Sequence, residues 1–248
     1  MSDKTAPILA ATDSAIEKAA KIIISGGLVA MPTETVYGLA ANAHDAHAVT
    51  KIFEAKDRPT FNPLIAHVAD VAQAAELGVM NEMAQTLATS FWPGPLTLIL
   101  KRLDDCPVCP LACAGLPTIA VRVPSHPVAQ DVIRLSGVAI AAPSANPSGK
   151  ISATRPVVIA ETMGDKLDMI LADGACAIGL ESTVVDVSGP HPVLARSGAI
   201  TLEMLEEALG RPVIRGDEKT SDKPTSPGQT LRHYAPETPL RLKAVDVA

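Results

Sequence analysis

The chain has 248 residues, of which 47% are apolar, so it can bury the core of one sizeable domain with a tail or of two small domains. Aromatic residues make up only 2%, so that core must be built from Ala, Val, Ile and Leu. A formal charge of −6 argues against a dedicated nucleic-acid binder, which usually carries a basic face. The polar start and the short apolar runs predict a cytoplasmic protein without membrane contact.

The first half of the chain alternates between helix and strand signals. A capping box at Ser14 and Glu17, followed by an apolar stripe, predicts a helix that stops at Gly26 and Gly27. A short buried strand at 28–31 then ends at Pro32. The apolar periodicity next predicts a helix at 46–55, a strand at 63–68, and helices at 71–77 and 81–90.

The second half continues this alternation. We expect strands at 96–100, 119–123, 138–142, 169–172, 183–187 and 193–195, and helices at 126–135, 156–163 and 202–209. The pattern indicates an α/β domain whose sheet has helical cover, although several strands in near succession do not require a purely parallel sheet. From residue 211 the sequence becomes polar and turn-rich, as in a linker or mobile loop, so we place the domain at 1–210 and the linker at 211–248.

The usual nucleotide-binding motifs do not occur, so a site must come from scattered polar residues at strand ends. Lys56 and Arg58 close the second predicted helix, where they could also simply complement its dipole. Ser144 and Asn146 stand between two prolines after a predicted strand. Their hydroxyl, amide and backbone N–H groups suit a phosphate or a carboxylate, although an ordinary turn has the same composition.

Two arginines stand in apolar strands or directly after them. Arg122 lies inside one predicted strand and Arg196 follows another. A buried guanidinium needs an anion. The anion could be a ligand or a neighbouring carboxylate, and Glu181 and Asp186 are available for such a salt bridge.

Cysteines and histidines give no metal site in this sequence. Cys106, Cys109 and Cys113 are close in sequence, but Cys176 is far away and no His is near, so we interpret them as small buried side chains. We interpret His44 and His47 as surface residues near a helix start. His67 ends a predicted strand and could be a satisfied core histidine.

Six segments, taken together, closely resemble the YrdC-like threonylcarbamoyl-AMP synthase family. They are residues 32–39 (PTETVYGL), 56–64 (KDRPTFNPL), 92–97 (WPGPLT), 115–124 (GLPTIAVRVP), 143–146 (PSAN) and 180–186 (LESTVVD). The match runs in order from about residue 16 to 209. It implies a twisted mixed α/β sheet with helices around a large concave cationic cavity.

The resemblance also implies a reaction. L-Threonine, bicarbonate and ATP would give threonylcarbamoyl-AMP and pyrophosphate, for threonylcarbamoyladenosine biosynthesis in tRNA. Mg²⁺ would be carried with ATP, and no protein metal site is implied. Separate transferase proteins would receive the product, so that tRNA is a partner only indirectly.

Roles for individual residues follow from the same resemblance. The family's catalytic lysine–arginine and serine–asparagine pairs match Lys56, Arg58, Ser144 and Asn146. ATP contacts are implied for Lys56, Thr60, Thr118, Ser144, Ser152 and Arg196, and Tyr234 would contact ATP as a lid residue. Arg122 would anchor the threonine carboxylate in a pocket shaped by Thr33, His67, Ala142 and Ser182.

Departures and alternatives remain. The family's long form continues after a linker into a second domain, and residues 226–236 carry that linker signature, so we expect a truncated or naturally short member. Ser197 stands where the family more often has proline. The alternatives are a non-catalytic domain that binds double-stranded RNA or tRNA, and the carbamoyltransferase domain of hydrogenase maturation, whose flanking zinc-finger and acylphosphatase modules this sequence does not show.

Overall fold

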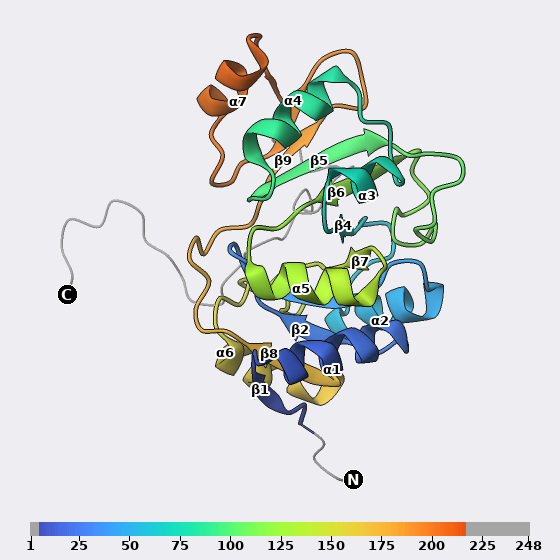
Figure 1. Cartoon of the computed structure of the whole chain (residues 1–248), viewed down its shortest axis with the longest axis vertical. Coiled ribbons are helices and arrows are strands. Elements are labelled where there is room, and N and C mark those ends of the chain that lie inside the picture. The colour runs from blue at the N-terminus through green and yellow to red at the C-terminus, as the bar shows by residue number, and fades with distance from the viewer. Residues whose placement is uncertain (1–4, 217–248) are drawn as a thin grey trace, which may run out of the picture.

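The computed structural model describes residues 5–216, which form one mixed sheet with helices on its faces (Figure 1). The strand order is β1-β8-β2-β3-β7-β4-β6-β5-β9-β10-β11. The strands are β1 (Ile8–Ala10), β2 (Val29–Met31), β3 (Gly38–Asn42), β4 (Ile65–His67), β5 (Leu96–Lys101), β6 (Thr118–Arg122), β7 (Ile140–Ala141), β8 (Met169–Ala172), β9 (Thr183–Asp186), β10 (Val193–Arg196) and β11 (Ile214–Arg215). Parallel and antiparallel pairs both occur, as predicted.

Seven α-helices and one 3₁₀ turn occur within the described residues. They are α1 (Asp13–Ile24), α2 (Ala46–Lys56), α3 (Val71–Ala75), α4 (Glu82–Phe91), α5 (Pro127–Ser136), α6 (Pro156–Met163), η1 (Gly164–Lys166) and α7 (Leu202–Leu209). All seven α-helices were predicted, with small differences at most ends. Not one of these helices has both the length and the apolar character needed to cross a bilayer.

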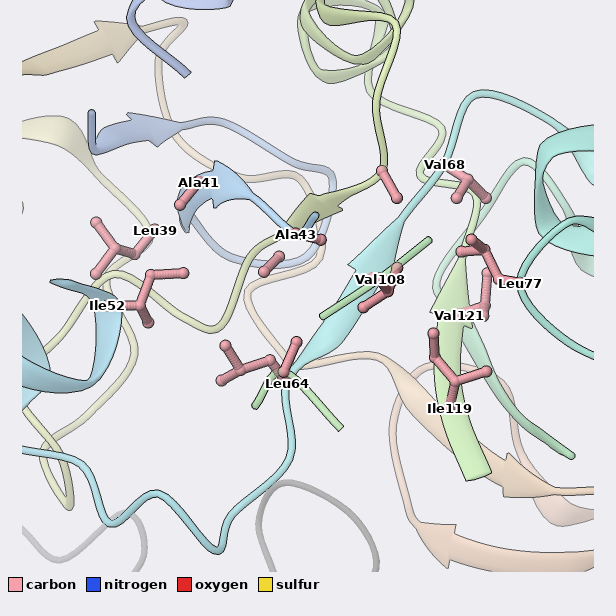
Figure 2. Packing of buried hydrophobic residues seen from close by; sticks show 14 of the residues in the cluster. Leu39, Ala41, Ala43, Ile52, Leu64, Val68, Leu77, Val108, Ile119 and Val121 are labelled. Carbon is pink, nitrogen blue, oxygen red and sulfur yellow. The ribbon is translucent and has the colours of Figure 1, made fainter. Parts of the chain in front are cut away.

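The core has a large part and a smaller part. The larger part extends from Ile52 of α2 past Leu64, which precedes β4, and Val108 to Ile119 and Val121 of β6 (Figure 2). The smaller part lies between α1, α5 and strands β2, β3, β7 and β8. Aliphatic side chains make up most of both parts, as the low aromatic content predicted, although Tyr37, Phe53 and Trp92 join the larger one.

Strand periodicity directs two polar side chains away from the larger core. Successive residues of a strand point to opposite faces, so Ile119 and Val121 face the core while Ala120 and Arg122 face the other side. The parallel pairing of β4 with β6 places His67 opposite Arg122 in register. The side chains of His67 and Arg122 therefore both project from the face of the sheet opposite the larger core.

Several local predictions need correction. The first helix is capped by Thr12, whose Oγ1 accepts from the Ala15 N–H, and not by Ser14. Strands β1, β3 and β11 were not predicted, because β1 and β11 are very short and β3 (GLAAN) has neither strand-favouring residues nor alternation. Strand β11 pairs with β10 beyond the expected boundary at residue 210, so the sheet continues into the segment expected to be a linker.

The structure shows where the cysteines near residue 110 and two of the histidines lie. Cys106, Cys109 and Cys113 are free and buried in the larger core, as predicted. Within residues 5–216 no three His, Cys, Asp or Glu side chains are grouped so that they could hold a metal ion. His47 is exposed, but His44 is half-buried and its Nε2 accepts from the Ala139 N–H, which corrects the expected surface position.

Candidate active site

Two adjoining hollows lie on the face of the sheet opposite the larger core. The inner hollow has a volume of about 40 Å³, and its polar lining is Thr33, Thr35, Arg58, His67, Arg122, Ser144, Glu181, Ser182 and Arg196. The outer hollow has a volume of about 390 Å³ and is lined by Val36, Ile151, Ser152, Gly179, Leu180, Glu181, Arg196, Ser197 and Gly198. Val36, Glu181 and Arg196 belong to both, so the two hollows share a wall.

Strand ends and the loops that follow them supply the inner hollow. His67 and Arg122 end β4 and β6, and Ala142 directly follows β7, where its N–H donates to Ile65 O at 3.1 Å. Ser144 forms an isolated bridge with Gly38, the first residue of β3. Residues more than a hundred positions apart thus meet at one place.

Arg122 is held at each of its three side-chain nitrogens. Nε donates to Gly94 O at 3.2 Å, one terminal nitrogen donates to Thr35 Oγ1 at 2.9 Å, and the other donates to Glu34 Oε1 at 2.6 Å. A guanidinium has five N–H groups. Within residues 5–216, these three bonds therefore leave one N–H on each terminal nitrogen unused.

The carboxylate partner of Arg122 is Glu34, which the sequence did not single out. Both side chains are buried, at 4% and 10% exposure for Arg122 and Glu34. Burial alone would raise the pKa of Glu34, but the charge of Arg122 and its hydrogen bond outweigh burial and hold that pKa below its usual range. Asp186, considered as a partner of the arginines, accepts instead from Ser188.

Arg196 is held by the segment that leads into β9. Its NH1 pairs with Glu181 Oε2, Nε donates to Ser182 O at 3.0 Å, and NH2 donates to Ser182 Oγ at 3.0 Å. The alternative of a salt bridge to Glu181 is therefore confirmed for Arg196. Glu181 Oε1 also accepts from Ser152 Oγ at 2.8 Å, so this carboxylate joins the walls of the outer hollow.

Gly198 allows this close packing. A Cβ at Gly198 would lie 2.5 Å from Thr183 N and 2.6 Å from Glu181 O, which is too close for any side chain. The turn after β10 can therefore approach residues 181–183 only with glycine at this position. Thr97 of β5 supports the same segment, since its Oγ1 lies 2.7 Å from Ser182 Oγ.

His67 is a neutral ring in this hollow. Its Nδ1 lies 3.3 Å from Ile65 O. Burial and the nearby charge of Arg122 lower its pKa to about 3. His67 therefore is both a hydrogen-bonded buried histidine and a lining residue.

Lys56 and Arg58 have different hydrogen-bond partners. Asp57, the residue after α2, caps the helix in the left-handed conformation, with φ of 50°. Arg58 lines the inner hollow, where its NH2 donates to Pro63 O at 2.9 Å, and burial lowers its pKa to about 10. The Lys56 ammonium instead donates to the backbone oxygens of Ser144 and Asn146, each at 2.5 Å.

The structure brings most of the predicted site residues together. Thr33, His67, Arg122, Ala142 and Ser182, the set expected around threonine, all line the inner hollow, and Ser152 and Arg196 line the outer hollow. Lys56, Asn146, the half-buried Thr118 and the exposed Thr60 line neither of these two hollows within residues 5–216. Tyr234 lies outside the described residues. Thr35, which lies two residues after Thr33 in the same motif, was missed.

Comparison with known proteins places these features in context. The Sua5/YciO/YrdC family model, described as telomere recombination, matches residues 21–198, and a model described as threonylcarbamoyl-AMP synthase, C-terminal domain, matches residues 200–247. The chain is 47% identical over 236 residues to the threonylcarbamoyl-AMP synthase of Bacillus subtilis, covering 94% of this chain and 68% of that protein. It is 38% identical over 261 residues to the Schizosaccharomyces pombe synthase, covering 93% and 64%.

A solved structure is also similar. The crystal structure of Pyrococcus abyssi Sua5 complexed with L-threonine superposes with a TM-score of 0.89 at 44% identity, covering 93% of this chain and 69% of that one. The chain therefore spans about two thirds of the length of these relatives.

Proposed function

We propose that this chain, which belongs to the Sua5/YciO/YrdC family, makes threonylcarbamoyl-AMP and pyrophosphate from L-threonine, bicarbonate and ATP. The observation that carries the proposal is the convergence of an arginine-anchored inner hollow and a larger outer hollow across one shared wall. Relatives that are named threonylcarbamoyl-AMP synthases support it at up to 47% identity.

The inner hollow suits the amino acid. The two N–H groups that Arg122 keeps, one on each terminal nitrogen, match the two oxygens of a carboxylate. Thr33, His67 and Ser182 place hydroxyl and imidazole groups around the remaining space. The related Sua5 whose structure was solved with L-threonine supports this choice of amino acid.

The outer hollow suits the nucleotide. Its volume of about 390 Å³ lies in the range of small-molecule and cofactor sites. Val36, Ile151 and Leu180 offer apolar surface, and the guanidinium of Arg196 gives the wall positive charge that suits phosphate oxygens. Because Arg196 also borders the inner hollow, an α-phosphate beside it would lie next to the amino group of threonine.

The reaction then has two steps. The ammonium group of threonine first loses a proton, and the resulting amine then forms a bond to the carbon of bicarbonate, which loses its hydroxyl with an amine hydrogen as water and gives a carbamate. A carbamate oxygen attacks the α-phosphate, and the bond from that phosphorus to pyrophosphate breaks. Such a transfer depends on positioning and charge stabilisation, which Arg58, Arg196 and Ser144 can supply without a protein nucleophile.

We expect Mg²⁺ to enter as part of the Mg-ATP substrate. The carboxylates beside the hollows, Glu34 and Glu181, are each paired with an arginine. Mg²⁺ on a nucleotide is usually held by phosphate oxygens, water and one or two carboxylates at most. A lining with only these two paired carboxylates agrees with an ion that arrives on the phosphates. The unstable product would pass to a transferase that acts on tRNA.

A reconstituted reaction tests the function directly. Protein, Mg-ATP, bicarbonate and single amino acids are mixed, and pyrophosphate and the adenylate are followed by mass spectrometry. Release should require threonine and bicarbonate together, and Arg122→Ala or Ser144→Ala should lose most of it. Arg134→Ala, which changes a surface arginine paired with Asp131, is the matched control.

Two results would contradict the proposal. Pyrophosphate release that does not depend on which amino acid is present would refute the substrate assignment. RNA binding that survives Arg122→Ala, without ATP consumption, would instead favour the alternative of a non-catalytic RNA-binding module.

A further inference from the structure

One connecting segment lines both hollows. This connector, residues 173–182, joins β8 to β9, which are the second and the ninth strand in the order of the sheet (Figure 1). Its residues Gly179, Leu180 and Glu181 line the outer hollow, and Glu181 and Ser182 line the inner one. The shape of both hollows therefore depends on where the connector lies.

Hydrogen bonds hold the middle of the connector against the loop that follows β2. The Ile178 N–H donates to Glu34 O at 2.9 Å, and the Gly179 N–H donates to Thr35 O at 3.0 Å. Most residues of the connector are exposed, so little apolar surface is buried along it. Because segments of this kind open locally at low cost, single hydrogen bonds weigh heavily in fixing its position.

The side chain of Tyr37 holds the start of the connector. Tyr37 is fully buried, and its hydroxyl donates to Gly174 O at 2.8 Å and accepts from the Asp173 N–H at 3.1 Å. A tyrosine hydroxyl can donate one hydrogen bond and accept others. One side chain therefore binds the first two residues after β8, at the point where the connector leaves the sheet.

The backbone of Tyr37 binds a further loop that reaches the hollows. Its N–H donates to Ala153 O at 2.9 Å, and its carbonyl oxygen accepts from the Ala145 N–H at 2.8 Å. These alanines directly follow Ser152 and Ser144, which line the outer and the inner hollow. Tyr37 is thus a residue at which segments from the walls of both hollows meet.

Packing explains the ring of Tyr37 but not its hydroxyl. The ring belongs to the larger core, where the ring of phenylalanine would fill the same space. The hydroxyl reaches out of that core to two backbone groups of the connector. A role in packing alone would not require these two bonds.

We propose that Tyr37 is a positioning residue, whose hydroxyl holds the connector so that residues 179–181 form the wall of the nucleotide site. The proposal deepens the proposed function and rests on it for the identity of the nucleotide. Within residues 5–216, Tyr37 lines neither hollow, so it acts on ATP only through the connector. Threonine binding should depend on it less, because the side chain of Arg122 is held by residues outside the connector.

Cys176 reports whether the connector stays in place. It lies inside the connector, and its thiol is half-buried. Burial raises the pKa of this thiol to about 11, so iodoacetamide should modify it slowly in the folded wild type at pH 8. Tyr37→Phe should speed this modification at least about fivefold, the factor that one lost hydrogen bond gives. Mass spectrometry of digested samples measures the rate at each cysteine.

Three further cysteines are buried in the larger core and serve as internal controls: Cys106, Cys109 and Cys113. They should stay unmodified in Tyr37→Phe. Ser136→Ala is the matched control variant, because it also removes a buried hydroxyl that donates to a backbone oxygen, Ile133 O at 2.8 Å. An unchanged rate at Cys176, or equal modification of all four cysteines, would overturn the proposal.

Steady-state kinetics test the link to the nucleotide. Tyr37→Phe should raise the KM for Mg-ATP about fivefold, whereas isothermal titration should show an affinity for L-threonine within about twofold of the wild type. A purely structural role would instead lower the amount of active protein, and with it the apparent kcat, at unchanged KM. Faster modification of Cys176 at an unchanged KM for Mg-ATP would overturn the proposal, because the connector would then move without affecting the nucleotide.

Failure of the proposed function would remain distinguishable from failure of this inference. Modification of Cys176 needs no substrate, so it tests the hold on the connector even in a protein that releases no pyrophosphate. Amide exchange gives a second such measurement, because the Asp173 N–H donates to the hydroxyl that Tyr37→Phe removes. This amide should exchange faster in Tyr37→Phe and not in Ser136→Ala. Equal exchange in wild type and Tyr37→Phe would refute the role of the hydroxyl.

Discussion

Replacing Glu34 by glutamine tests how the ligand-free protein keeps Arg122 charged and oriented. The substitution keeps the shape of the side chain and one oxygen that can accept from Arg122, but it removes the negative charge and replaces the other oxygen with an NH2 group. Arg122 is buried at 4% side-chain exposure and lies 2.6 Å from Glu34. The variant therefore leaves a buried guanidinium without a compensating charge.

The size of the effect follows from burial. Removing one partner of a buried ion pair costs about 3–5 kcal/mol. The hydrogen bond that glutamine retains is worth about 1 kcal/mol. We therefore expect Glu34→Gln to lower the free energy of unfolding by about 3 kcal/mol at pH 7. The double variant Glu34→Gln/Arg122→Met should lose less than the sum of the two single variants, because it leaves no buried charge.

Urea unfolding at several pH values measures this effect. The pKa of Glu34 is lowered in the folded protein, so its contribution to stability is complete above the ordinary value of 4.5 and is lost as the pH falls through the folded pKa. The difference between wild type and Glu34→Gln should therefore shrink in acid. Saturating L-threonine should also reduce the difference at pH 7, since its carboxylate would supply the missing charge.

Refutation of this reasoning is straightforward. A loss below about 1 kcal/mol that does not change with pH would mean that Glu34 does not compensate the charge of Arg122. Additive single and double variants would lead to the same conclusion. Glu17→Gln, at an exposed glutamate paired loosely with Lys21, serves as the control and should change little.

Three further predictions concern the walls of the hollows. His67 has a pKa of about 3, so its ring should remain neutral in NMR spectra at pH 5, and protonation of the unfolded state should lower stability as the pH falls below 6.5. Ser182→Ala removes the partner of Thr97 Oγ1 and of Arg196 NH2, so urea unfolding should show a loss of about 1–3 kcal/mol, which Ser188→Ala should not match. Gly198→Ala forces backbone atoms apart, so it should lower both the melting temperature and pyrophosphate release. Gly189→Ala should change neither, because a Cβ at that position meets open space.

The parts of the fold that sequence predicted best are those with strong local signals. Helices α6 and α7 and strand β8 have the predicted bounds, since Pro156 marks a first turn and Gly210 follows a helix end. Strand β3 has no such signal. Its glycine and alanines are placed in the sheet by pairing with β2 and β7, so tertiary structure decides its conformation.

The candidate site was predictable as a set of residues and not as a set of contacts. The family resemblance named the expected threonine set, and all five of its residues line the inner hollow. The pairing of Arg122 with Glu34 joins residues 88 positions apart and leaves no trace in local sequence. The hydrogen bonds from the Lys56 ammonium to Ser144 O and Asn146 O likewise join residues 88 and 90 positions apart.

Of the two explanations first considered for the arginines, the internal carboxylate is observed for both, and it does not conflict with a bound anion. A buried guanidinium without a partner would be costly in the free protein, so Glu34 and Glu181 are required before any ligand arrives. For Arg122, Glu34 Oε1 accepts one of five N–H groups, and the bonds to Gly94 O and Thr35 Oγ1 use two more within residues 5–216. An internal salt bridge at a strand end is therefore compatible with an anion site, because the same bond that compensates the buried charge also orients the donors that remain.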